Sequence, residues 1–138
     1  MLQLAGESTY PLMPLYAILV EDNQTIRDTL MPAMSELAGI QVVAFAETAM
    51  DAIKAARDVP HQWSLMVLDL FLRNGSGLDV LKALGPWDPE REVVVLTNFA
   101  TPDVRERCMT LGAKAVFDKS TELEQFFDYC MYRHGAPG

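Results

Sequence analysis

Short hydrophobic runs alternate with amphipathic stretches along most of the chain. Runs of three or four hydrophobic residues occupy positions 17–20, 65–68, 93–96 and 115–117. Near-continuous runs of this length are typical of strands that are buried on both faces of a parallel sheet. A shorter and more mixed run adds one further strand. The predicted strands span residues 15–21, 40–45, 63–69, 92–97 and 114–117.

Helical periodicity follows each predicted strand, and a residue that suits a helix start precedes each helix. Asn, Ser and Thr side chains accept hydrogen bonds from the free backbone N–H groups of a first helical turn. The expected caps are Asn23, Thr48, Ser76, Thr101 and Ser120. With these caps included, the predicted helices span residues 23–39, 48–57, 76–84, 101–112 and 120–131.

The first predicted helix has an apolar face and one unusual residue. Its apolar positions follow helical spacing, so we expect them to be buried together. Pro32 lies inside this helix and lacks a backbone N–H, so it is expected to kink the helix or to remove one hydrogen bond. The apolar positions are Ile26, Leu30, Met34 and Leu37.

Strands that alternate with helices predict an α/β fold. Connections of this kind join parallel strands through right-handed crossovers, which gives a three-layer sandwich. We expect a flavodoxin-like (βα)5 arrangement with the parallel five-stranded sheet in the order 2-1-3-4-5, and a site where strands one and three diverge. Residues 15–134 form the predicted domain, with an amino-terminal extension at 1–14 and a carboxyl-terminal tail at 135–138.

Polar side chains are placed where the predicted strands end. Glu21 and Asp22 come at the end of the first strand, and Asp69 closes the third. Thr97 closes the fourth strand, and Lys119 comes just after the fifth. The carboxyl ends of parallel strands lie at one edge of a sheet, so we expect these groups to converge. Three carboxylates, one hydroxyl and one ammonium suit the binding of a divalent cation and of a phosphoryl group.

Three carboxylates at one point predict a cation. Two like charges about 4 Å apart repel by roughly 4 kcal/mol at an effective dielectric constant of 20. Proteins relieve such clusters by protonation, by a cationic side chain or by a metal. Carboxylates suit Mg²⁺, which takes one or two of them together with phosphate oxygens and water. Zinc would need histidine or cysteine, and His61 and His134 lie away from the predicted edge.

The charge of the chain narrows the classes of partner. The formal net charge is -8 and the isoelectric point is near 4.6. Binding to nucleic acid depends mainly on basic contacts to phosphate, so direct nucleic-acid binding is not expected. An anionic membrane surface is an equally poor match. The acidic surface has a simpler explanation, which is that it keeps the protein soluble.

The cysteines and the amino terminus give expectations about the compartment. Cys108 and Cys130 fall on apolar positions of predicted helices without metal-ligand spacing, so we expect buried reduced thiols. Residues 1–14 lack both a basic segment and a long apolar stretch, so neither a signal peptide nor a membrane span is predicted there. A cytoplasmic protein is therefore expected.

Five short motifs follow one another along the chain, and each of them alone is a weak signal. In this order and spacing they are highly specific. The chain resembles the receiver domain of two-component response regulators, over about residues 15–134. The motifs are Ile18-Leu19-Val20-Glu21-Asp22, Val67-Leu68-Asp69-Leu70, Gly75-Ser76-Gly77-Leu78, Val95-Leu96-Thr97 and Val116-Phe117-Asp118-Lys119-Ser120.

This resemblance implies roles for the clustered acids. Asp69 matches the position that accepts a phosphoryl group in the family. Glu21 and Asp22 match Mg²⁺ ligands, and the backbone carbonyl of Phe71 matches a third ligand. Asp69 itself also contributes to the metal site.

The resemblance also implies a switch. Thr97 and Lys119 match the pair that senses the phosphoryl group, and Phe117 matches the aromatic residue whose rotamer follows the threonine. From the residues alone, Phe117 reads more simply as an aromatic side chain packed at the edge of the sheet. The surface that responds is placed at about residues 101–134.

The chain departs from the family pattern near the predicted site. Arg73 stands where a proline is frequent, so the entry to the third helix is expected to differ in shape. Asn98 stands where a small residue is usual, and its side chain is expected to narrow the approach of a phosphoryl donor. Phe71 and Phe99 are bulky and apolar, and we predict that they shield the acyl phosphate from water and slow its loss.

The preferred interpretation is a stand-alone receiver that is not an enzyme in the usual sense. It would take phosphate from a histidine kinase or a histidine phosphotransfer protein and act through a downstream protein or onward transfer.

The alternative is a receiver-like interaction module that is not phosphorylated. A phosphatase with an aspartyl nucleophile would need a second acid where Phe71 stands, and a flavodoxin would place a phosphate beside Glu21 and Asp22. Homodimer formation stays open.

Overall fold

Strand and helix alternate throughout the part of the chain that the computed structural model describes, residues 15–58 and 63–131. The strands are β2 (Leu15–Val20), β3 (Ile40–Ala46), β4 (Leu65–Leu68), β5 (Glu92–Thr97) and β6 (Ala115–Asp118). The helices are α1 (Gln24–Ala38), α2 (Ala49–Asp58), α3 (Gly77–Leu84), α4 (Pro102–Thr110) and α5 (Leu123–Cys130). The predicted extension at 1–14, His61, His134 and the predicted tail lie outside the described residues.

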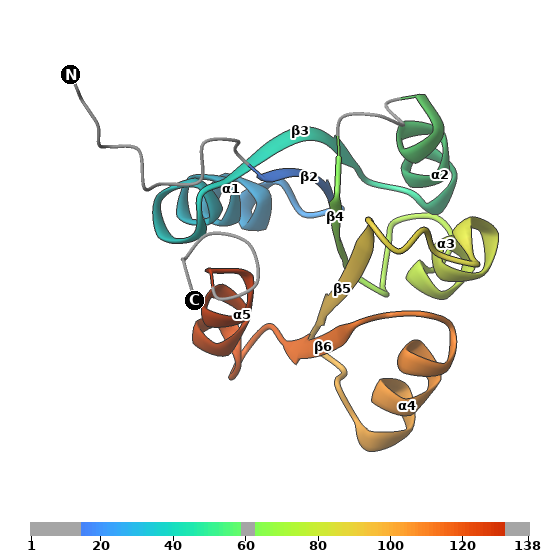
Figure 1. The fold of residues 1–138 in the computed structure, drawn as a ribbon. Coiled ribbons are helices and arrows are strands. Elements are labelled where there is room, and N and C mark those ends of the chain that lie inside the picture. The colour runs from blue at the N-terminus through green and yellow to red at the C-terminus, as the bar shows by residue number, and fades with distance from the viewer. Residues whose placement is uncertain (1–14, 59–62, 132–138) are drawn as a thin grey trace.

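The five strands form one sheet in the order β3-β2-β4-β5-β6, and every neighbouring pair is parallel. Numbered along the chain, this is the predicted order 2-1-3-4-5. Figure 1 shows α1 and α5 on one face of the sheet, and α2, α3 and α4 on the other. The predicted three-layer α/β architecture is therefore confirmed.

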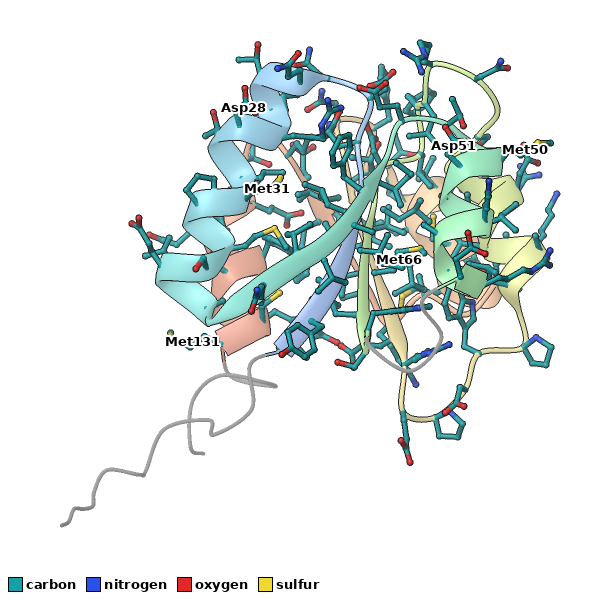
Figure 2. The ribbon with its side chains drawn as sticks, turned by 90° about the horizontal axis from the view of Figure 1, so that it is seen from above. Asp28, Met31, Met50, Asp51, Met66 and Met131 are labelled. Carbon is teal, nitrogen blue, oxygen red and sulfur yellow. The ribbon has the colours of Figure 1, made fainter. Side chains whose placement is uncertain are left out.

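The central strands are buried on both faces. Ile18 and Leu19 are neighbours on β2 and both are almost fully buried, but they belong to different core clusters. Ile18 packs with the cluster that includes Ala52 of α2, whereas Leu19 packs with the cluster that includes Phe126 of α5. Figure 2 shows Met66 of β4 in the middle of the molecule, with α1 and α2 on either side of it. Burying one such side chain contributes about 1.5–3 kcal/mol.

Most of the predicted helix starts are confirmed in atomic detail. The side chains of Asn23, Ser76 and Thr101 accept backbone hydrogen bonds at the starts of α1, α3 and α4. Thr48 Oγ1 accepts from the backbone N–H of Asp51 beside α2. Ser76 and Asp79 form a reciprocal capping box.

The prediction that Ser120 caps the last helix is wrong. Helix α5 begins at Leu123, and its cap residue Glu122 makes no side-chain hydrogen bond to the helix. The carboxylate of Asp118 instead accepts hydrogen bonds from the backbone N–H groups of Ser120 and Thr121, at 2.7 and 3.2 Å. An aspartate that binds the backbone two residues ahead forms a turn, and this turn delays the helix.

The structure decides three other expectations in detail. Leu37 is 54% exposed, because Ala38 takes the buried position four residues beyond Met34. Pro32 lies on the exposed side of α1, and the helix continues through it. Because proline has no backbone N–H, the helix lacks one hydrogen bond at this position. Strand β4 begins at Leu65 rather than at residue 63, although Trp63 is buried.

Candidate functional site

Strand pairing brings Glu21 and Asp69 together. Strands β2 and β4 are parallel neighbours in which Val20 pairs with Leu68, so the next residue of each strand emerges at the same level. The backbone N–H of Asp69 donates to the carbonyl of Val20 at 3.0 Å, which fixes this register. Both acids are therefore held by buried backbone, one residue beyond the strand ends.

The predicted acidic cluster is present. Glu21, Asp22 and Asp69 each offer a carboxylate oxygen, and these oxygens lie within 4.8 Å of one another. Glu21 is 2% exposed and Asp69 is 6% exposed, whereas Asp22 is half-buried. Lys119 Nζ lies 2.6 Å from Glu21 Oε1 and 3.0 Å from Asp69 Oδ2. One ammonium thus bridges two of the three carboxylates.

Burial and pairing shift the pKa values of this group in defined directions. Burial raises the pKa of Glu21 above its ordinary value, although the hydrogen bond and charge of Lys119 oppose the shift. Burial alone would lower the pKa of Lys119, but the hydrogen bonds and negative charges of Glu21 and Asp69 outweigh it and raise the pKa. Lys119 therefore remains a firmly charged ammonium at neutral pH.

The cluster fits a small divalent cation. With all its acids ionised, its three carboxylates face one ammonium, so two negative charges stay uncompensated at short range. The donors are carboxylate oxygens, which match the preference of Mg²⁺, and among residues 15–58 and 63–131 no histidine or cysteine joins this group. Glu21, Asp22 and Asp69 are thus suitable ligands. The proposed ligation by the Phe71 carbonyl stays a prediction.

The sheet brings Thr97 next to the lysine segment. Strand β5 ends at Thr97, which pairs with Asp118 of β6, and the backbone N–H of Lys119 donates to the Thr97 carbonyl at 2.9 Å. Thr97 is fully buried, and its hydroxyl accepts from the backbone N–H of Phe99 at 3.3 Å. Four of the predicted strand ends thus deliver their polar groups to one edge of the sheet.

Phe117 lies on β6 and is half-buried. Its ring is in edge-to-face contact with Phe126 and Tyr129, at centroid distances of 6.0 and 5.6 Å. These contacts fit the simpler interpretation of a packed aromatic side chain. A rotamer change coupled to Thr97 stays a prediction from the resemblance.

The loop after β4 holds the carboxylate of Asp69. The backbone N–H of Phe71 donates to Asp69 Oδ1 at 3.3 Å, so each oxygen of the carboxylate has its own partner. Gly77 opens α3 directly against this loop and donates to the Leu70 carbonyl at 2.9 Å. A Cβ at Gly77 would clash with the Asp69 carbonyl and lie only 2.9 Å from the Leu70 Cα, so only glycine allows this approach.

A cavity of about 260 Å³ opens beside the site. It lies between the start of α1 and the segments that follow β5 and β6, and Asn98 and Lys119 are among its lining residues. The side chain of Asn98 accepts a hydrogen bond from the Ser120 hydroxyl at 3.0 Å. Asn98 is therefore held at the mouth of this cavity.

One buried arginine beside the acidic cluster could not be found from the sequence pattern. Arg27 of α1 donates to the Glu21 carbonyl at 2.8 Å and pairs with Glu47 at the same distance. Glu47 also pairs with Arg73, in the loop that follows Asp69. Helical periodicity alone could not find this group, because Arg27 stands on a face that is otherwise apolar.

Comparison with known proteins agrees with this geometry. The family of the response regulator receiver domain matches residues 17–130. This chain belongs to that family. Receiver domains are phosphoacceptor signalling modules of two-component systems, and they generally bind Mg²⁺ at an acidic pocket. The predicted membership is confirmed, and residues 15–58 and 63–131 contain no helix with the length and apolarity to cross a bilayer.

The relatives differ in how much of their own length this chain spans. The polar-differentiation response regulator DivK of Brucella anthropi is 29% identical over 118 residues, which are 84% of this chain and 93% of DivK. The response regulator GacA of Pseudomonas aeruginosa is 26% identical over 108 residues, which are 78% of this chain. The chain spans only about half the length of GacA, at 50%.

A solved structure shows the same fold. The phosphorylated cyanobacterial phytochrome response regulator RcpA superposes with a TM-score of 0.70 at 25% sequence identity. The match covers 88% of this chain and 91% of the RcpA chain. The arrangement of strands and helices is therefore that of a known receiver.

Proposed function

We propose that Asp69 accepts a phosphoryl group from a phosphohistidine, in a Mg²⁺-dependent reaction. The donor would be a histidine kinase or a histidine phosphotransfer protein. The observation that carries the proposal is the carboxylate of Asp69, which is buried, held by the Phe71 N–H and by Lys119, and clustered with two further acids. RcpA, a relative of the same fold, was solved in a phosphorylated state.

In this transfer the protein forms a single covalent bond, between Asp69 and phosphorus. A carboxylate oxygen of Asp69 forms a bond to phosphorus while the bond between phosphorus and the donor imidazole breaks. The bonding electron pair stays with the imidazole nitrogen, which takes up a proton. Phosphoryl transfer of this kind depends mainly on positioning and on charge stabilisation.

Lys119 would stabilise the charge that develops. Its ammonium already touches Asp69 Oδ2 at 3.0 Å, so it can bind an oxygen of the incoming group without crossing the site. Thr97 would donate its hydroxyl hydrogen to the same group. Glu21, Asp22 and Asp69 would hold Mg²⁺, which when bound neutralises charge on the phosphoryl oxygens.

The donor would approach through the cavity beside Lys119. Its lining includes half-buried apolar residues of α1 and α5 that could contact a partner helix, here Ile26 and Leu123. Asn98 stands at this approach, and we expect it to restrict the entry of bulky donors. Output would follow as a change in protein contacts at about residues 101–134, of which 101–131 are described, or as onward transfer of the phosphoryl group.

Intact-protein mass spectrometry tests the proposal. The chain is incubated with phosphoramidate and Mg²⁺, and we expect the mass of one phosphoryl group to appear in wild type. The signal should be absent in Asp69→Asn and after chelation of the metal. Asp28→Asn is the matched control, because Asp28 is exposed on α1 and outside the acidic cluster.

The same experiment separates the alternative function. An interaction module that signals without phosphorylation would gain no mass under any condition. A wild-type protein that stays unmodified with Mg²⁺ and donor would therefore support the alternative and remove the phosphoacceptor proposal.

A further inference from the structure

Arg105 of α4 uses all the nitrogens of its guanidinium to join three segments. Its Nε donates to the Ala100 carbonyl at 2.8 Å, and one terminal nitrogen donates to the Val116 carbonyl at 2.9 Å. The other terminal nitrogen donates to Glu122 Oε1 at 2.7 Å and forms an ion pair with it. The planar fork of arginine suits this set of directions, and a lysine could not reproduce it.

The partners of Arg105 lie on both sides of the candidate phosphate-sensing pair. Ala100 lies between β5 and α4, three residues after Thr97, and Val116 lies on β6, three residues before Lys119. Glu122 lies on the segment that follows Lys119, and its Oε1 also accepts from the backbone N–H of Asp118 at 2.9 Å. The guanidinium therefore connects the backbone that carries Thr97 with the backbone that carries Lys119.

Two further hydrogen bonds join the same segments closer to the site. The backbone N–H of Lys119 donates to the Thr97 carbonyl, and Ser120 Oγ donates to Asn98 Oδ1. Arg105 adds hydrogen bonds to the Ala100 carbonyl on one segment, and to the Val116 carbonyl and the Glu122 carboxylate on the other. Together these contacts hold the two segments at a fixed separation.

We propose that Arg105, with Glu122, is a positioning residue for the Thr97 and Lys119 pair, and that it ties α4 to the phosphoryl site. This inference rests on the proposed function. Arg105 does not touch the reacting atoms. It acts by holding the two segments at the spacing that lets a hydroxyl and an ammonium bind one phosphoryl group.

The partial exposure of Arg105 and Glu122 favours a role in geometry over a role in overall stability. The side chains of Arg105 and Glu122 are about one third exposed, and exposed ion pairs contribute little to folding. Two backbone carbonyls and a carboxylate nevertheless converge on one rigid donor group. Small displacements of groups that bind a transition state are costly, since a shift of about 1 Å can slow a reaction by roughly a hundredfold.

The test compares matched arginine variants. Arg105→Gln removes the fork, and Glu122→Gln removes its charged partner but leaves both carbonyl contacts in place. Arg91→Gln is the control, because Arg91 also donates to a backbone carbonyl, that of Trp63, and stacks on its ring. Trp63 lies before β4, at the end of the sheet opposite to Asp69.

Three quantities are measured for each variant. The first is the initial rate of phosphorylation by phosphoramidate, followed by intact mass. The second is the affinity for Mg²⁺ by titration calorimetry, and the third is the midpoint of urea unfolding. We expect Arg105→Gln to be phosphorylated roughly tenfold more slowly than wild type, while its Mg²⁺ affinity changes by less than about twofold. Arg91→Gln should keep the wild-type rate.

A double variant adds a readout that a merely structural role would not produce. If the two residues act as one positioning unit, Arg105→Gln/Glu122→Gln should be no slower than Arg105→Gln alone. Additive effects, equal rates for the Arg105 and Arg91 variants, or a parallel loss of Mg²⁺ affinity would each overturn the inference. If Arg105→Gln does not fold, the inference is tested with Glu122→Gln alone. A phosphorylation rate equal to that of wild type in Glu122→Gln would then overturn it.

The proposed function and this inference fail differently. A wild-type protein that takes no phosphoryl group removes both. A wild-type protein that is phosphorylated, with Arg105→Gln at the same rate, removes only the positioning role.

Discussion

The rings of Phe71 and Phe99 lie in contact with 4.7 Å between their centroids, although each side chain is more than half exposed. Each phenylalanine follows a site residue by two positions, and its backbone N–H donates to the side chain of that residue, Asp69 or Thr97. The two loops that follow Asp69 and Thr97 are therefore joined by an aromatic pair at the surface.

This pair is expected to slow the loss of a phosphoryl group from Asp69. Bulky rings beside the site exclude the water that would attack the acyl phosphate. Phe71→Asn/Phe99→Glu should lose phosphate roughly tenfold faster, which corresponds to about 1.4 kcal/mol in the barrier. Radiolabel decay measures the rate. Met50→Asn is the control, since Met50 is an exposed apolar residue on α2 that points away from the sheet in Figure 2. Decay no faster than wild type would refute the shielding.

Removal of Mg²⁺ should lower the melting temperature of the protein. A ligand that binds only the folded state at ten times its Kd contributes about 1.4 kcal/mol, or roughly 5 °C in Tm for a domain of this size. Asp22→Asn should lose most of this response, because it removes one of the three clustered carboxylates. Glu124→Gln, an exposed acid on α5, should keep it. Calorimetric scans with Mg²⁺ and with chelator check this, and equal shifts in both variants would contradict the site.

Gly77→Ala should damage both stability and phosphorylation. The new methyl group would clash with the Asp69 carbonyl and approach Leu70 Cα to 2.9 Å, so α3 or the loop must move. We expect a loss of about 2 kcal/mol in the free energy of unfolding, together with slower phosphorylation of Asp69. Gly39→Ala is the comparison. Gly39 has φ of 65° but free space around it, so that variant should cost about 1 kcal/mol and keep the rate. Denaturant unfolding and mass analysis measure both properties.

Glu122 should contribute more to the free energy of unfolding at a pH above its ordinary pKa than at a pH below it. Hydrogen bonds from Arg105 and from the Asp118 N–H lower the pKa of Glu122 below 4.5. A carboxyl group whose pKa is lower in the folded state contributes stability above 4.5, and that contribution is lost as the pH falls through the folded pKa. The difference in unfolding midpoint between wild type and Glu122→Gln should therefore shrink from pH 6 to pH 3, by urea titration. A difference that grows on acidification would contradict the hydrogen bonds.

Both cysteines should resist modification in the folded protein. Burial raises the pKa of the Cys108 thiol, and burial together with the charge of Glu92 raises that of Cys130 to about 12. The reactive thiolate is therefore scarce at pH 8. Labelling with a disulfide reagent should be slow in buffer and complete in denaturant. Rapid labelling of the native chain would show that these side chains are more accessible than the structure has them.

The sheet and the acidic site could be predicted from the sequence because their signals are local. Hydrophobic runs mark the buried strands, and parallel order sends their carboxyl ends to one edge. Glu21, Asp69 and Lys119 therefore met as expected. Four of the five family motifs repeat the same information, since each of them is a strand end with its polar residue, and the motif at 75–78 marks the start of α3.

Contacts made by long side chains could not be predicted in this way. Arg27 and Arg105 bind backbone carbonyls of other segments, those of Glu21 and Val116, and nothing in the sequence around either arginine marks it. Ser120 failed as a cap for a related reason. The carboxylate of Asp118 accepts from the backbone N–H groups of Ser120 and Thr121, so these residues form a turn and the helix starts at Leu123.

The ion pair between Lys119 and Glu21 joins residues that are 98 positions apart. A nascent chain that ends before residue 119 has the carboxylates but lacks their only cationic neighbour among the described residues. Competence to receive a signal should therefore arise only after residue 119 has been synthesised, so that shorter nascent chains stay inactive.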